Sequence, residues 1–516
     1  MNENKEFELT RNGQDVFSES GVEYVLPDYN GDVRKILYSE ATLRPAGRFV
    51  GEDGVEFSGQ IAYKVIYSDS ENKISSAEFF SDYDMKVKAL PEGLVDADCL
   101  VRISNFAIRL LGPRKFSAKS SIVAETLITG KKVLEPRMWD KAKEWEIQTK
   151  EKTFNVRKAK TCAPIEREIA ESMEHFDGVT EDEVKILYYK SEPIVEECRA
   201  EGDEVTVSGR IKLSALVEIE GNVAYMIKKT VPFEQTVGAG EDCSGCELFA
   251  DVTLLSERIT VNPDDTGCEM VANIIFETVL RKEKNEALTL ITDAYLTSCP
   301  TENTYHDFSY TEICERVIHR VKNTVSPERG ELCEGAIREV VFVNAFPKVE
   351  SVKFSSGAAQ IKGEIKYMGV TSETNDDGSI SYSSLKYTTE FEENVKISCH
   401  NDGKCNATVK IQVEEAGADI DAQRVYISSE LRFDILACND ENERILSECV
   451  GRDNEKYPLE KATVRVYYPD PEEDLFEVAR KFHIPLSRLC EANSISTEAV
   501  SADKNDKIHP ERLIIL

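Results

Sequence analysis

Several cysteines in this chain have spacings that raise metal binding or redox chemistry. Cys243 and Cys246 form a CxxC motif, and Cys399 is followed by His400 and, six residues on, by Cys405. Zinc requires four donors, but no second CxxC or HxxxH accompanies the CxxC motif, and a thioredoxin-like role lacks its βαβ context. The other cluster matches no standard ligand pattern. We therefore expect no metal site and no cofactor, and we interpret these cysteines as packing residues.

Motifs for other enzymatic chemistry are missing as well. The chain has 6 histidines, and none lies in an HExxH, GxSxG or Walker-type setting. Nothing in the sequence therefore indicates a general base, a nucleophile or a phosphate-binding loop. We expect a protein that is not an enzyme and has no catalytic residues. An active site assembled from distant carboxylates is the alternative that one sequence leaves open.

Length and charge narrow the class of protein further. The chain has 516 residues, which predicts several domains, and a net charge of -32, from 95 acidic and 63 basic residues. Such a charge repels nucleic acids and anionic membranes. The first thirty residues contain no signal-peptide pattern, and no apolar run of about 18 residues predicts a membrane span. We expect a soluble cytoplasmic protein whose 14 cysteines are mostly reduced thiols.

An internal repeat organises most of the chain. The tetrapeptide KILY occurs at Lys35–Tyr38 and again at Lys185–Tyr188, and a glycine follows each tyrosine by 21 residues. A third, more divergent copy ends REVVF at Phe342 and has its glycine at the same distance. The three glycines are Gly59, Gly209 and Gly363. Three segments with one spacing predict three copies of one structural unit.

Each repeat has the alternation typical of antiparallel strands. An aromatic residue lies 24 to 28 residues beyond the glycine, in SDYDMKV, VPFEQTV and TEFEENV, and an alternating run then starts at a cysteine. Turn residues at 375–379 (NDDGS) and 400–404 (HNDGK) predict hairpins. Each repeat therefore reads as a small β-sandwich or curled sheet. Between repeats, IEREIAESM and TEICERVIHRV predict short helices, the second because Ile313, Val317 and Val321 share one helical face.

A different pattern occupies the end of the chain, in EEDLFEVARKFHIPLSRLCEANSI from Glu472 to Ile495. Asp474 can cap a first helix, because Glu477 stands three residues later as in a capping box. Pro485 can open a second helix. Strand-like segments lie before and after, ATVRVYY and ERLIIL, so we expect the order β, α, α, β.

This terminal segment resembles the LysM domain. EEDLFEVARKF is similar to the family's first helix, LSRLCEANSI to the second helix with its Asn493, and RLIIL to the closing strand. The family's glycine is replaced by Glu472, and the loop STEAVSADKNDKIHP is longer than usual. LysM domains commonly bind N-acetylglucosamine-containing glycans, so the resemblance allows binding of peptidoglycan or a chitin-type polymer.

Most of the chain resembles the SipL family of spore morphogenesis proteins, in which SPOCS-domain repeats precede one LysM domain. VSGRIKLSALVEI and VPFEQTV in the second repeat are the segments most similar to that domain. The expected fold is mainly β: an extension at 1–30, repeats at 31–140, 181–296 and 333–450 separated by segments 141–180 and 297–332, and a LysM domain at 459–516. The resemblance implies a non-enzymatic scaffold of spore-coat assembly in the mother-cell cytoplasm, at the forespore surface.

The resemblance also implies a partner. In the SipL family the LysM domain docks the basement ATPase of the spore coat (SpoIVA), and other coat morphogenetic proteins are possible partners. We expect contact in a groove between the start of the first helix and the loop after Asn493. Its residues are Asp474, Leu475, Phe476, Asn493, Ser494 and Ile495. The alternative is a glycan-binding protein of the cell envelope that uses the same groove.

Overall fold

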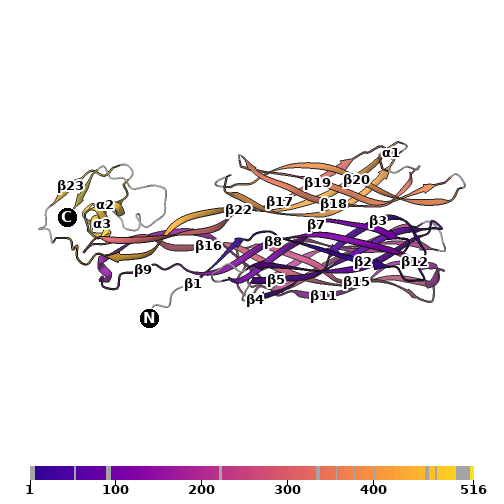
Figure 1. The fold of residues 1–516 in the computed structure, drawn as a ribbon, viewed down its shortest axis with the longest axis horizontal. Helices are drawn as coiled ribbons and strands as arrows, with labels where there is room; N and C mark the ends of the chain where they lie inside the picture. The colour runs from indigo at the N-terminus through magenta and orange to yellow at the C-terminus, as the bar shows by residue number, and fades with distance from the viewer. Residues whose placement is uncertain are drawn as a thin grey trace.

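The computed structural model confirms a mainly β protein. It describes residues 6–515 except 52–53, 89–93, 220–223, 333–336, 356, 376–377, 400–402, 422, 459–463, 471–472 and 496–511. Within these ranges, no helix has the length and apolar character needed to cross a membrane. Figure 1 shows an elongated molecule whose strands run mostly along its long axis.

Each sequence repeat contributes a sheet centred on the strand that carries its glycine. The central strand has the KILY-type strand on one side and the strand with the aromatic landmark on the other. In repeat 1 these strands are β3 (Val33–Leu43), β5 (Gly54–Asp69) and β6 (Ile74–Lys88), and the short strand β4 (Gly47–Gly51) also pairs with β5. In repeat 2 they are β12 (Val184–Glu201), β13 (Glu204–Ile219) and β14 (Tyr225–Gly238). In repeat 3 they are β18 (Ile337–Ser355), β19 (Ala358–Thr374) and β20 (Ile380–Lys396).

A second sheet completes each repeat, and its central strand is the closing apolar run. In repeat 1, β1 (Glu6–Asn12), β2 (Val16–Val25) and β7 (Leu94–Gly112) pair with β8 (Lys115–Val133). In repeat 2, β10 (Ile147–Thr161), β11 (Ile165–Asp177) and β15 (Glu247–Pro263) pair with β16 (Gly267–Leu296). In repeat 3, β17 (Thr301–Val325) and β21 (Cys405–Ile420) pair with β22 (Val425–Gly451), which also has β9 (Arg137–Met138) beside it in parallel.

The second sheets place the connecting segments inside the repeats. Segment 1–30, which we expected to be an extension, supplies β1 and β2, and segments 141–180 and 297–332 supply their counterparts β10, β11 and β17. Helical structure between the repeats is limited to single turns within the described residues. These are at Glu144–Glu146, Glu181–Glu183 and α1 (Arg329–Leu332).

Two predicted helices are wrong, because IEREIAESM lies in β11 and TEICERVIHRV lies in β17. The apolar residues Ile313, Val317 and Val321 recur every four residues, a spacing that fits one face of a strand as well as one face of a helix. Pairing along β22 satisfies the backbone of β17, and tertiary contact therefore decides between the two structures.

One of the two predicted hairpins is wrong as well. The NDDGS turn does join paired strands, β19 and β20, with Gly378 at φ 83°. The stretch 400–404 instead connects β20 to β21, which lie in different sheets. Positions 400–402 of that stretch lie outside the described residues.

The repeat spacing reflects one conserved strand register. Gly209 lies opposite Phe233 across β13 and β14, and the other repeats pair Gly59 with Tyr83 and Gly363 with Phe391. The strand on the other side of each glycine is irregular at that position. In repeat 2, β12 has a bulge after Val195, and the other two repeats have a bulge or a break between strands at the same place. A glycine allows this close backbone approach, and the aromatic ring covers the space it leaves.

The hydrophobic core of each repeat lies between its two sheets. Every second side chain of β13 from Val205 to Ala215 is buried, and this face packs against Met270, Ile274 and Phe276 of β16. The period of two places one face of each strand in the core. Burying each large apolar side chain contributes about 1.5–3 kcal/mol.

The three repeats meet at a shared core of equivalent residues. Tyr38, Tyr188 and Phe342 occupy one repeat position, and their ring centroids lie 5.0 to 5.6 Å apart. Glu40, only 2% exposed, accepts a hydrogen bond of 2.9 Å from each tyrosine hydroxyl, and burial raises the pKa of both tyrosines. Equivalent positions of the three repeats therefore pack against one another at one shared contact.

Candidate interaction site in the C-terminal module

The C-terminal module has the predicted order of two strands around two helices. Its elements are β23 (Arg465–Tyr467), α2 (Leu475–Lys481), α3 (Leu486–Ala492) and β24 (Leu513–Ile515), and β23 pairs antiparallel with β24. The predicted capping box is confirmed: Asp474 accepts a hydrogen bond from the Glu477 N–H (2.8 Å), and Glu477 accepts one from the Asp474 N–H (3.1 Å). Pro485 is the N-cap residue of α3.

Asn493 joins the second helix to the closing strand. Its amide group donates to the carbonyl oxygens of Leu489 and Ile514 (2.8 Å each), and its Oδ1 accepts from the Ile514 N–H (2.6 Å). These three bonds use most of the hydrogen-bonding capacity of an asparagine side chain. Asn493 therefore holds the module together and has little capacity left for a ligand.

The start of α2 packs against the repeats. Leu475 and Phe476 are 5% and 4% exposed, and the Phe476 ring meets Tyr295, at the end of β16, edge to face at 5.0 Å. The Tyr295 hydroxyl donates to the Ile484 carbonyl at 2.7 Å. An aromatic pair of this geometry adds about 0.5–1.5 kcal/mol to the burial of its area. This side of the module is thus an intramolecular interface.

Ion pairs surround this interface. Lys150 of β10 pairs with Asp474, and Arg480 of α2 pairs with Asp293 of β16. Burial alone would raise the pKa of Asp474, but hydrogen bonds from Lys150 and from the Glu477 N–H outweigh it and hold that pKa below its ordinary value. Asp474 is therefore charged at neutral pH and already has its partners.

The structure divides the six predicted site residues into three groups. Asp474 and Phe476 contact the repeats, and Leu475 and Asn493 belong to the module's own packing. Ser494 is exposed, at φ 55°, and Ile495 is half-buried beside the module's core. The loop 496–511, the other wall of the expected groove, lies outside the described residues. Within the described part of the module, these residues do not form one open groove.

The β23–β24 pair has an exposed apolar face on the side away from the module's core. Val464, Val466 and Tyr468 on and beside β23 are 70%, 57% and 69% exposed, and Ile514 of β24, opposite Val466, is 39% exposed. We call these four residues the outer face. Apolar residues alternate at 464, 466 and 468 in the sequence. This alternation predicts a strand, but it does not by itself indicate that the apolar face of the strand is exposed.

The cysteines differ in part from the expectation of reduced thiols. Cys399 and Cys405 form a disulfide, whereas 11 other described cysteines are outside disulfides, and six of these are buried. Cys243 of the CxxC motif is among the buried ones, in the core of repeat 2, where Cys246 also packs. The packing interpretation thus holds for the CxxC motif.

Comparison with known proteins adds no identification. No known family model matches the sequence. No curated protein matches it either. A solved lipopolysaccharide-binding protein is 7% identical over 51% of this chain and 91% of its own, with a TM-score of 0.07. At that TM-score, the likeness carries no argument about fold or function.

Proposed function

We propose that this chain is a non-enzymatic scaffold of endospore coat assembly, of the SipL type, that docks a protein partner through its C-terminal module. The partner that fits the resemblance is the SpoIVA-like basement ATPase of the coat. The site of action would be the mother-cell cytoplasm, at the forespore surface. The repeats would supply an extended β surface, and the module would supply the contact.

The observation that carries this proposal is the outer face of the module. Three of its side chains are more than half exposed, and burying apolar side chains of this kind drives most protein association. Among the described residues, β23 and β24 pair only with each other, and Asn493 bonds the outward-facing backbone groups of Ile514, so the exposed side chains of the pair, and not a strand edge, offer the contact. We therefore assign partner contact to the outer face and to the exposed Ser494, which follows the Asn493 that bonds Ile514.

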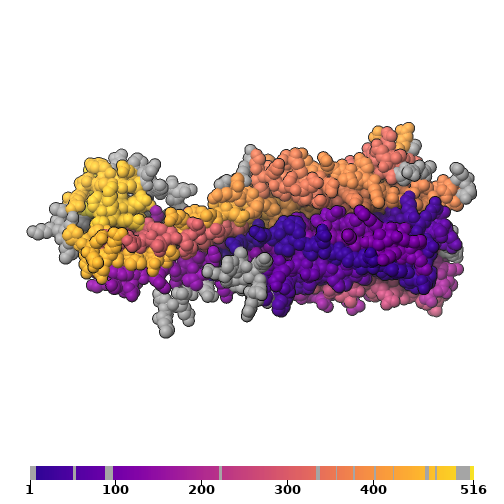
Figure 2. All heavy atoms as spheres, viewed as in Figure 1, coloured from indigo at the N-terminus to yellow at the C-terminus, as the bar shows by residue number. Residues whose placement is uncertain are grey.

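The mounting of the module also supports a scaffold. Figure 2 shows the module (yellow) at one end of the molecule, beyond a narrower neck. The neck includes the long strands β16 and β22, labelled there in Figure 1, and the start of β17, which pairs with the end of β22. Because Phe476 contacts β16 and Asp474 pairs with β10, the module is held in place at this end of the long strands. A partner bound to the outer face would then be held at the same end of the molecule.

A parallel binding experiment tests the class of partner. Full-length protein is titrated with the purified basement ATPase and, separately, with soluble peptidoglycan fragments, and binding is followed by biolayer interferometry. The proposal expects saturable binding to the ATPase and none to the glycan. Glycan binding without ATPase binding would replace the scaffold with the envelope alternative. The full chain is required because the module's core includes Tyr295 of repeat 2.

A further inference from the structure

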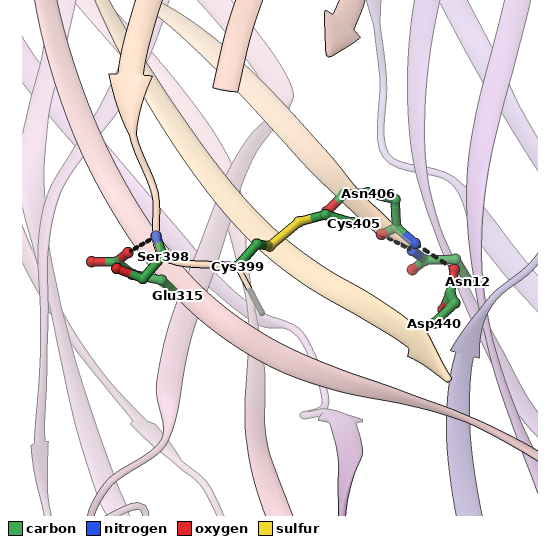
Figure 3. Close-up of a disulfide and its surroundings, with 7 residues drawn as sticks. All are labelled: Asn12, Glu315, Ser398, Cys399, Cys405, Asn406 and Asp440. Atoms are coloured by element: carbon green, nitrogen blue, oxygen red, sulfur yellow. Dashed lines mark hydrogen bonds between the residues drawn. A yellow bond between two sulfur atoms is a disulfide. The ribbon is translucent and has the colours of Figure 1, made fainter. Parts of the chain in front are cut away.

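Three cysteines of repeat 3 converge, although Cys314 is distant in sequence from the other two. The sulfur atoms of Cys314, Cys399 and Cys405 all lie within 4.8 Å of one another. Figure 3 shows how the last two are held: the Ser398 N–H donates to Glu315 (2.7 Å), next to Cys314, and Asn406 is bonded to Asp440 and Asn12. Hydrogen bonds thus anchor the chain on both sides of the Cys399–Cys405 pair.

The disulfide joins two of these three cysteines, and Cys314 lies beside it. Cys314 lies at the bulge of β17, between Ile313 and Glu315, where pairing with β22 is interrupted. A bulge changes the direction in which a side chain points. The third sulfur is therefore brought to the pair by a specific irregularity of the strand.

Repeat 2 has cysteines at the corresponding places. Cys162 follows the end of β10, where pairing with β16 is interrupted, and its N–H donates to the Leu280 carbonyl (2.8 Å). Cys243 and Cys246 precede β15, as Cys399 and Cys405 precede and begin β21. Repeat 1 has Gly13 in place of Cys162, donating to the Thr126 carbonyl in the same way. Cysteines at these chain positions therefore occur in one further repeat, and repeat 1 shows that the fold does not require them.

We propose that, in the reduced chain, Cys314, Cys399 and Cys405 form a tri-thiolate site for Zn²⁺. Zinc prefers tetrahedral thiolate ligands at about 2.3 Å, which places the sulfurs about 3.8 Å apart. In the structure Cys399 and Cys405 are bonded to each other and the Cys314 sulfur lies within 4.8 Å of both, so reduction of the disulfide and rotation of its two side chains are needed to reach this spacing. Water or another small ligand takes the fourth position. The sulfur atoms of Cys162, Cys243 and Cys246 do not all lie within 4.8 Å of one another, so we assign the site to repeat 3.

The disulfide and the metal exclude each other. A sulfur in the Cys399–Cys405 bond cannot act as a thiolate ligand, so the oxidised chain keeps only one of the three donors. Metal binding to protonated thiols also releases their protons. The proposal therefore expects up to three protons, one per thiol, for each zinc bound near neutral pH, and no binding after oxidation.

Zinc titration of full-length protein tests this site. The reduced, metal-free chain is titrated with Zn²⁺ in competition with a chromophoric chelator. We expect one tight equivalent, weakened at least tenfold by Cys314→Ser and by Cys405→Ser. Cys162→Ser, at the equivalent place in repeat 2, and Cys299→Ser, a buried cysteine elsewhere, are matched controls that should bind as the unaltered chain does.

Three results would overturn the proposal. These are no tight zinc binding by the reduced chain, unchanged binding by folded Cys314→Ser protein, and loss of binding in Cys162→Ser alone. If the repeat 3 variants fail to fold, Co²⁺ replaces Zn²⁺ in the unaltered chain. The site is refuted if the cobalt protein lacks the charge-transfer absorption expected for three thiolate ligands. It is also refuted if this absorption persists after the thiols are oxidised.

Discussion

Replacing a repeat glycine with alanine tests the shared strand register. A Cβ atom at Gly209 would lie 2.1 Å from the carbonyl oxygen of Ile194, a backbone atom of the bulged strand β12. At Gly59 the three nearest atoms all belong to the Tyr83 side chain, the closest at 2.5 Å. The added Cβ atom at Gly209 would thus meet backbone that cannot move alone. At Gly59 it would meet a side chain that can rotate.

The difference in contact sets the expected cost. Overpacking costs about 1–3 kcal/mol, and displacing β12 also disrupts ladder hydrogen bonds at about 1 kcal/mol each. We expect Gly209→Ala to lower the free energy of unfolding of its repeat by about 3 kcal/mol, and Gly59→Ala by about 1–2 kcal/mol. For a domain of this size the first corresponds to a fall in Tm of about 6–12 °C.

Thermal unfolding followed by circular dichroism measures the cost, and double variants identify its cause. Tyr83→Leu should rescue Gly59→Ala with a coupling energy of about 1 kcal/mol. Phe233→Leu should leave most of the Gly209→Ala loss in place, because the Ile194 carbonyl remains. Equal rescue in both repeats, or a Gly209→Ala protein as stable as the unaltered chain, would refute this reasoning.

Three further predictions concern buried or paired groups. Lys190→Met should cost about 3 kcal/mol in urea unfolding, because it removes the cation 3.6 Å from the buried Glu40 carboxylate; an unchanged midpoint would contradict this. A hydrogen bond to Asp264 raises the pKa of His175, so its stabilisation is complete below about pH 6.5 and is lost as pH rises through the raised value. His175→Ala should therefore lower Tm more at pH 5.5 than at pH 8.5, and an equal or reversed effect would contradict it. Tyr295→Ala should speed amide hydrogen exchange in α2, because the ring holds the module to β16, without speeding it in the repeats; unchanged exchange would show that other contacts suffice.

The sequence carried the local features of the fold. The equal spacing from KILY to glycine follows from one strand register, and the aromatic landmark is the glycine's cross-strand neighbour. The capping box at Asp474 was also readable, because its partner Glu477 is three residues away. Features of this kind depend on residues close in sequence or on a period of two.

Long-range contacts could not be predicted in the same way. A spacing of four residues fits a helix or a strand face, and only the pairing of β17 with β22 distinguishes the two. Phe476 was expected in an open groove because nothing local indicates that Tyr295, 181 residues earlier, covers it. Convergence of Tyr38, Tyr188 and Phe342 likewise depends on how the repeats pack.

The central claim, that a protein partner binds the outer face, is tested most directly by one dissociation constant. Val466, 57% exposed, is changed to aspartate in the full chain, with Phe17→Asp as the matched control, since Phe17 is 74% exposed on β2 of repeat 1. A charge in an apolar contact should weaken binding of the basement ATPase at least tenfold, or about 1.4 kcal/mol, while Phe17→Asp binds as the unaltered chain does. Equal affinity of the Val466→Asp protein and the unaltered chain would contradict the account.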